Sequence, residues 1–177
     1  MDIDIRRLAD HDSVAELTGL LHRSFGTWAD RGIRFLASGQ SEDVTRQRVA
    51  DGECYVAVAD GRLLATITVK PPGCGGWGGQ WYARPEVAGF GQLAVLPELQ
   101  QGGLGAALIG VAEERARALG ATELALDTAE GALPLVGYYR RRGYRPVAFA
   151  QWRHANYRSL ILSKPLGLLR PQSEIAL

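Results

Sequence analysis

The feature that most constrains this chain is the glycine-rich turn Gln100-Gln101-Gly102-Gly103-Leu104-Gly105, which has the spacing Q-x-x-G-x-G. An apolar, strand-like run from Phe90 to Leu96 leads into the turn, and an amphipathic helix pattern follows it. The N-terminus of a helix carries partial positive charge and backbone N–H groups without intrahelical partners, and glycines let an anion approach those groups closely. The turn therefore predicts a binding site for a phosphate or pyrophosphate group.

Two other glycine-loop motifs fit this segment poorly. A nucleotide P-loop, G-x-x-x-x-G-K-[ST], needs a Lys-Ser or Lys-Thr pair, and the only lysines in the chain are Lys70 and Lys164. A Rossmann fingerprint, G-x-G-x-x-G, opens the first βαβ unit, whereas Gly103-Leu104-Gly105 lies past the middle of the chain. A glycine turn that merely joins a strand to a helix remains an alternative on these residues alone.

Composition sets the broad class of the protein. The 177 residues fit one domain, with 46% hydrophobic and 22% charged residues. The formal net charge is +1 and the basic residues are scattered, so no nucleic-acid partner is expected. The chain has no apolar run of the ~20 residues that a membrane span needs and no signal-peptide pattern, so we expect a cytoplasmic protein with no membrane partner. Cys54 and Cys74 are predicted to be free thiols, and no metal site is predicted.

The N-terminal half predicts the order β-α-α-β-β. A short strand over residues 3–8 precedes a helix that begins at Ser13, which forms a capping box with Glu16, and ends at about Phe25. A second helix begins at residues 41–43, after a link that is rich in aromatic residues. Strands over residues 54–59 and 63–69 are joined by Asp60-Gly61, a strong hairpin signal, and should pair antiparallel.

The C-terminal half predicts a long loop and then β-α-β-α-β-β. Residues 71–89 are rich in glycine and contain Trp77, Trp81 and Tyr82, which argues for a functional loop. The later elements are a strand over 90–96, a helix from Gly103 to Gly120, a strand over 122–127, a helix over 132–142, and closing strands over 144–152 and 159–162.

This order of elements, with the glycine turn between the fourth strand and the third helix, resembles the GNAT superfamily of acyl-CoA-dependent N-acyltransferases. The resemblance covers roughly residues 3–164 and is strongest from Phe90 to Tyr144. It implies an α/β (α+β) fold: a single GNAT-like domain over residues 1–164, with a central mixed, mostly antiparallel sheet of about seven strands and four helices. The fourth and fifth strands should splay apart to hold acyl-CoA. Residues 165–177 are expected to form a C-terminal tail.

A second motif, Y-x-x-x-G-Y from Tyr139 to Tyr144, resembles the family signature Y-x-x-x-G-[FY]. The resemblance implies that Tyr139 lies near the cofactor sulfur as the general acid, because a phenol there can protonate the departing thiolate. Taken alone, such a tyrosine is more often a half-buried core residue. The family pattern also places an Asn seven residues before the tyrosine, where this chain has Ala132, so that one side-chain contact is lost.

The resemblance assigns acetyl-CoA to two adjacent segments. The strand Leu93-Ala94-Val95 would bond the pantetheine arm through its main chain like an added strand, and one N–H would polarise the thioester carbonyl. The glycine turn would hold the pyrophosphate. The expected cofactor-binding residues are Leu93, Ala94, Val95, Gln100, Gln101, Gly102, Gly103, Leu104, Gly105 and Ala106.

Asp127 is the candidate general base, because an amine of pKa ~10.4 must lose a proton before it attacks. A strand-end Asp is as often a turn or cap residue, and Glu86 and Gln92 are further candidates near the cleft. The acceptor is expected between the aromatic link and the 71–89 loop. The candidate acceptor-binding residues are Phe25, Trp28, Trp81 and Tyr82.

Together these patterns predict an N-acetyltransferase that moves acetyl from acetyl-CoA to a primary amine by direct transfer in a ternary complex. A non-catalytic acyl-CoA-binding sensor or partner-binding module is the alternative, which Ala132 favours and Tyr139 disfavours. A mononucleotide-binding α/β domain is a third. The acceptor, a small-molecule or peptide amine, is left open, as is the oligomeric state, a homodimer included.

Overall fold

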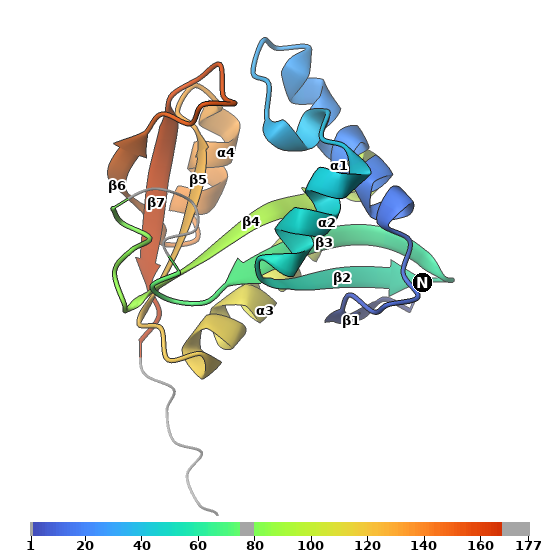
Figure 1. The fold of residues 1–177 in the computed structure, drawn as a ribbon, viewed down its shortest axis with the longest axis horizontal. Coiled ribbons are helices and arrows are strands. Elements are labelled where there is room, and N and C mark those ends of the chain that lie inside the picture. The colour runs from blue at the N-terminus through green and yellow to red at the C-terminus, as the bar shows by residue number, and fades with distance from the viewer. Residues whose placement is uncertain (1, 75–79, 168–177) are drawn as a thin grey trace, which may run out of the picture.

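The strands form one mixed sheet in which β4 (Val87–Val95) and β5 (Glu123–Ala129) are the parallel neighbours (Figure 1). The structure is a computed structural model that describes residues 2–74 and 80–167. Within them the sheet has seven strands in the order β1-β2-β3-β4-β5-β7-β6, and the other neighbouring strands pair antiparallel. The strands are β1 (Asp4–Arg7), β2 (Glu53–Ala59), β3 (Arg62–Lys70), β4 (Val87–Val95), β5 (Glu123–Ala129), β6 (Arg145–Ala150) and β7 (Ser159–Pro165).

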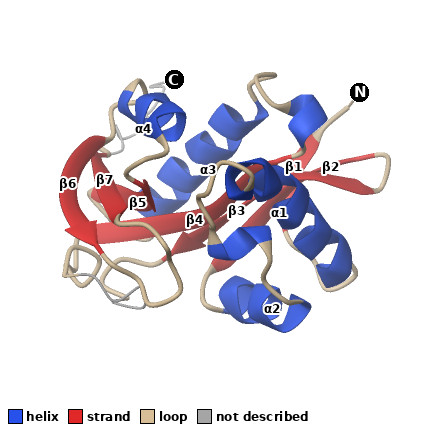
Figure 2. Ribbon diagram, turned by 90° about the horizontal axis from the view of Figure 1, so that it is seen from above, coloured by secondary structure: helices blue, strands red, loops and turns tan. Residues whose placement is uncertain are grey.

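Four α-helices cover the two faces of this sheet. They are α1 (Val14–Ala29), α2 (Glu42–Ala50), α3 (Leu104–Ala118) and α4 (Leu133–Arg140), with short 3₁₀ turns η1 (Leu36–Ser38) and η2 (Pro97–Leu99). Figure 2 shows α1 and α2 on one side of the strands and α3 and α4 on the other. The predicted fold, a mostly antiparallel sheet of seven strands with four helices, is confirmed.

The predicted helix starts are also confirmed, with one difference at α1. Ser13 and Ser41 cap α1 and α2, because their hydroxyls accept hydrogen bonds from the N–H groups of Glu16 and Val44. The Glu16 carboxylate does not close the predicted capping box. Its Oε1 accepts a hydrogen bond from the N–H of Leu63 at 2.8 Å and so ties α1 to the start of β3.

The β2–β3 hairpin forms as predicted, but β4 begins earlier than the sequence suggests. Asp60 and Gly61 have φ angles of 50° and 74°, the left-handed conformation that a two-residue hairpin turn requires. β4 begins at Val87 and not at Phe90. Its first residues, Val87 to Gly89, pair with β5 through main-chain hydrogen bonds. Such pairing does not depend on the side chains, so a glycine-rich sequence can form a strand without showing the apolar pattern that predicts one.

The predicted splay of β4 and β5 is present. The two strands pair only from Val87 to Gly89 on β4, although β4 continues to Val95 and β5 to Ala129. A β-bulge lies just beyond the last pair, where Gln92 and Leu93 face Ile67 of β3, and Gln92 has a φ of 53°. A bulge bends its strand and increases its twist, so β4 turns away from β5 at this point.

The main core lies between the sheet and the helices on both faces. Leu17 and Leu21 of α1 are fully buried on one face, and Leu108 of α3 on the other. Just after β7, the N–H of Leu166 donates a hydrogen bond to the Thr122 carbonyl at 2.9 Å, which holds this part of the chain beside the start of β5. Most of the predicted tail, residues 168–177, lies outside the described residues. No helix in the described part of the chain is long and apolar enough to span a membrane.

We expect Leu108→Ala to lower the free energy of unfolding by about 2–5 kcal/mol, because Leu108 is 0% exposed and its loss leaves a cavity under the sheet. Leu133→Ala is the matched control, since Leu133 is 71% exposed and should change the stability by less than about 0.5 kcal/mol. Urea unfolding measures both. Equal losses for the two variants would contradict this packing of α3.

Candidate functional site

A cleft of about 1160 Å³ opens where β4 and β5 diverge. Its lining comes from the end of α1, η1, α2, β4, the glycine turn, β5, α4 and the β6–β7 loop. It brings together eleven of the predicted site residues: Phe25, Trp28, Leu93, Val95, Gln100, Gln101, Gly103, Gly105, Ala106, Asp127 and Tyr139.

Other predicted residues do not line this cleft. The side chains of Ala94 and Leu104 are buried in the main core, and Gly102 is an exposed residue of the turn outside the cleft lining. Trp81 and Tyr82 belong to a second, smaller cluster beneath β5 and β7, and Trp81 stacks on Arg84 at 4.2 Å. Trp77 lies outside the described residues.

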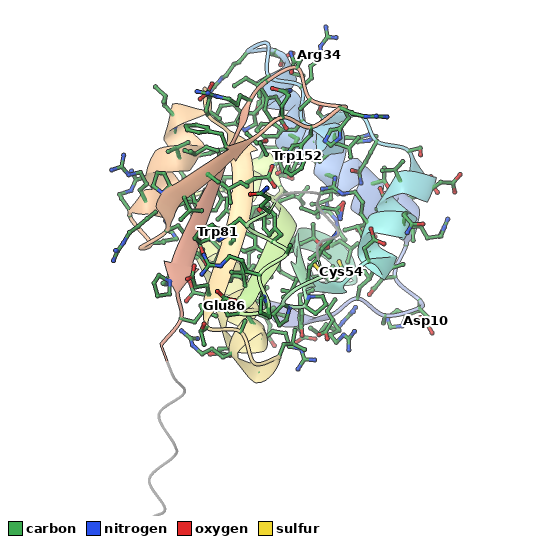
Figure 3. All side chains as sticks on the ribbon, turned by 60° about the vertical axis from the view of Figure 1, so that its left-hand side comes forward. Asp10, Arg34, Cys54, Trp81, Glu86 and Trp152 are labelled. Carbon is green, nitrogen blue, oxygen red and sulfur yellow. The ribbon has the colours of Figure 1, made fainter. Side chains whose placement is uncertain are left out.

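The position of Trp81 follows from the early start of β4, which carries the preceding segment to the far end of the sheet. Figure 3 shows Trp81 between Glu86, which lies below it, and Trp152, which lies above it. Glu86, a further candidate base, lies at that far end beside Arg84 and away from the cleft lining. Ala132 is fully buried at the start of α4 and does not line the cleft either.

The glycine turn has the geometry of an anion-binding site. Gln101 and Gly103 have φ angles of 67° and 87°, and α3 starts immediately afterwards with no side-chain cap at its first turn. Its leading N–H groups are therefore available to an anion. A Cβ on Gly105 would lie 3.1 Å from the Tyr138 hydroxyl and 3.6 Å from Cγ2 of Val95, so this position also requires a small residue.

The splayed strand was expected to leave main-chain N–H and C=O groups unpaired, but those of Val95 are both hydrogen-bonded. The Ser24 hydroxyl donates to the Val95 carbonyl at 2.9 Å and accepts from the Val95 N–H at 3.2 Å. The side chain of Gln100 donates to the same carbonyl at 3.1 Å. An added chain that bonds Val95 must therefore replace the Ser24 hydroxyl. No sequence pattern points to Ser24, since it lies within an ordinary amphipathic helix.

Tyr139 has its ring held in the core and its edge on the cleft. It is 7% exposed, and its ring contacts those of Phe90, Tyr138 and Tyr144 at centroid distances of 6.1, 5.3 and 6.2 Å. Within the described residues its hydroxyl makes no hydrogen bond. Burial raises the pKa of Tyr139, so the phenol stays protonated through the neutral range. The group can therefore act as a proton donor.

Asp127 lies across the cleft on β5, between two hydrogen-bond donors. Its Oδ2 accepts from the Trp152 indole at 2.8 Å, and its Oδ1 accepts from the Tyr82 hydroxyl at 3.4 Å. Tyr82 thus supports the carboxylate from the side opposite the cleft, which differs from its predicted contact with the acceptor. The carboxylate is oriented and can receive a proton or bind a cation.

The aromatic link expected beside the acceptor contributes Phe35 to the lining as well, and other lining residues were not expected from the sequence. Phe35 and Tyr157 extend the aromatic wall that Phe25 begins, with ring centroids 5.3 Å apart for Phe25 and Phe35 and 5.2 Å for Phe35 and Tyr157. Trp152 and Tyr157 come from the β6–β7 loop, whose sequence has no motif. Arg48 on α2 also lines the cleft. These residues meet only through the tertiary fold.

Comparison with known proteins identifies the family of this chain. The profile of the Acetyltransferase (GNAT) family matches residues 17–144. The S-(2-succino)cysteine N-acetyltransferase of Bacillus subtilis (strain 168) is 32% identical over 142 residues, which cover 78% of this chain and 82% of the relative. The S-alkylcysteine N-acetyltransferase of the same organism is 31% identical over 157 residues, covering 85% and 83%.

A solved structure shares the fold at low sequence identity. The crystal structure of a GNAT family acetyltransferase from Elizabethkingia anophelis with acetyl-CoA bound superposes with a TM-score of 0.66 at 16% identity, over 92% of this chain and 97% of that one. This chain belongs to the GNAT family of acetyltransferases. It is an N-acetyltransferase that uses acetyl-CoA, as its two motifs predict, and the glycine turn and the splayed strands fit that co-substrate.

We expect Gly105→Val to weaken CoA binding by at least about 10-fold, because the new side chain would press on Tyr138 and Val95 at the turn. Gly110→Ala on α3 is the control, since a Cβ there meets nothing within 4 Å and the helix should tolerate it. Isothermal titration with CoA measures both affinities. A folded Gly105→Val variant with unchanged affinity would exclude this turn from the binding site.

Proposed function

We propose that this enzyme acetylates the α-amine of an S-substituted cysteine by direct transfer from acetyl-CoA in a ternary complex. The observation that carries the proposal is one cleft that contains the glycine turn, the phenol of Tyr139 and the carboxylate of Asp127. The acceptor class is supported by the two relatives above 30% identity, which are both named as N-acetyltransferases of cysteine thioethers.

The residues that would hold acetyl-CoA follow the line of the cleft. The N–H groups at the start of α3 would bind the pyrophosphate, and the main chain of Leu93 and Val95 would bind the pantetheine arm. Arg142, whose guanidinium lies 3.6 Å over the Tyr138 ring, adds positive charge beside the turn. When bound, acetyl-CoA supplies the acetyl thioester.

The two ionisable residues then divide the proton transfers. Asp127 would accept a proton from the acceptor ammonium, which frees the nitrogen lone pair for attack on the acetyl carbon. Tyr139 would donate its proton to the sulfur as the C–N bond forms and the C–S bond breaks. The N–H of Leu93, next to the bulge, would polarise the acetyl carbonyl. The nitrogen loses its second proton through solvent, and that proton restores the Tyr139 phenol. The products are the N-acetyl amine and the free thiol.

We expect Tyr139→Phe to lower kcat by about 10²–10⁴-fold with little change in acetyl-CoA binding, the span typical of a lost general acid. Tyr138→Phe should have a much smaller effect, because its hydroxyl lies toward the glycine turn. Thiol release measured with a chromogenic disulfide reports kcat. Full activity of Tyr139→Phe, or a larger loss in Tyr138→Phe, would contradict this assignment of the acid.

The acceptor class has its own test. We expect kcat/KM for S-alkylcysteines or S-(2-succino)cysteine to exceed that for polyamines and for peptide N-termini by at least about 10-fold. A panel of these amines at fixed acetyl-CoA, with product identified by mass spectrometry, measures the preference. A peptide or polyamine as best acceptor would contradict the proposed class, and CoA binding without turnover of any amine would favour the non-catalytic module.

A further inference from the structure

Arg48 is a cation in the cleft with unused hydrogen-bonding capacity. It projects from α2 into the lining, and its Nη1 donates to Oε1 of Gln40 at 2.7 Å. Within residues 2–74 and 80–167 no carboxylate lies within ion-pair distance of it. A guanidinium carries five N–H donors and remains charged in proteins, so most of its donors are available to a ligand.

A buried polar network holds this guanidinium in place. Gln40 is 3% exposed, and its amide nitrogen donates to the Thr45 hydroxyl at 2.8 Å and to Gln92 Oε1 at 3.2 Å. Gln92 is the bulge residue of β4 and precedes Leu93. Buried polar groups are costly unless satisfied, so such a network fixes geometry. It links the position of Arg48 to the part of β4 where the transfer is proposed to occur.

A charge of opposite sign lies on the other side of the same cleft. Asp127 is held by Trp152 and is not ion-paired with Arg48, yet it is near enough that its charge opposes the lowering of the Arg48 pKa by burial. Two separated, oriented and opposite charges in one cleft are complementary to a zwitterion. A free α-amino acid presents this pattern, with an ammonium and a carboxylate on one carbon.

We propose that Arg48 binds the α-carboxylate of an amino-acid acceptor and that Asp127 faces its ammonium group. This inference rests on the proposed function and adds a specificity-determining residue to it. The planar guanidinium suits a carboxylate, because the two can form paired hydrogen bonds. The acceptor side chain would then extend toward the aromatic wall of Phe35 and Tyr157.

The other lysine and arginine side chains of the lining are less suited to this role. Arg141 and Arg153 are exposed, and Lys70 and Arg142 already have partners in the described structure. Lys70 Nζ lies 3.8 Å from Asp51 Oδ2, and Arg142 donates to the Tyr138 carbonyl and stacks on its ring. Arg48 also lies on the same side as the bulge of β4, to which Gln40 and Gln92 connect it. The acceptor carboxylate is therefore assigned to Arg48.

The test compares S-methylcysteine with S-methylcysteine amide, which keeps the amine and the thioether and lacks the negative charge. We expect the wild type to prefer the carboxylate, and Arg48→Met to lower kcat/KM for S-methylcysteine by about 10²-fold through KM while changing that for the amide by less than about threefold. Arg48→Lys should restore part of the loss, since it keeps the charge without the planar fork.

Arg46→Met is the matched control, because Arg46 is an exposed cation on the same helix and outside the cleft lining, so both acceptors should be unaffected. Unchanged CoA affinity and thermal midpoint in Arg48→Met show that the site and the fold are intact. Equal losses for both acceptors, or no loss for either, overturn the role of Arg48 and leave the proposed function standing. Failure of the wild type to acetylate either compound overturns both.

Discussion

The short stretch of pairing between β4 and β5 determines where the cleft and the glycine turn lie. The two strands share main-chain register over three residue pairs and then separate, since the bulge at Gln92 and Leu93 turns β4 aside. A parallel pair needs a crossover helix, and here α3 is that helix. The glycine turn that starts α3 therefore lies at the open end of the same gap. The bulge in β4 thus determines the position of both the cleft and the anion-binding turn.

The cleft keeps charges in partly buried positions where they cost stability. Asp127 is oriented by Trp152 and Tyr82, and Arg48 by Gln40. Neither charge neutralises the other, although a direct ion pair would reduce the desolvation cost of both. Because such separated charges cost stability, the residues that carry them are more simply explained by a role in binding a ligand than by a role in packing. This separation is the physical basis for expecting a zwitterionic acceptor.

Local sequence patterns predicted those features that are local in the structure. The cap at Ser13, the turn at Asp60-Gly61 and the left-handed Gly103 follow from short-range stereochemistry, and the Y-x-x-x-G-Y motif gave Tyr139. What the sequence could not give depends on segments distant in the chain. Trp81 was expected at the acceptor, but it lies under the sheet because β4 starts at Val87. Ser24, Arg48 and Trp152 reach the cleft from three separate elements and carry no motif. Their contacts exist only in the folded chain.

A crystal structure of the enzyme with CoA would show directly whether the gap between β4 and β5 is the cofactor site. We expect the pantetheine arm between β4 and β5, bonded to the main chain of Leu93 and Val95, with the Ser24 hydroxyl displaced. We also expect the pyrophosphate on the N–H groups that begin α3, and the sulfur within hydrogen-bonding reach of the Tyr139 hydroxyl. CoA bound outside the β4–β5 gap, or a sulfur far from Tyr139, would show that the gap does not hold the cofactor as proposed.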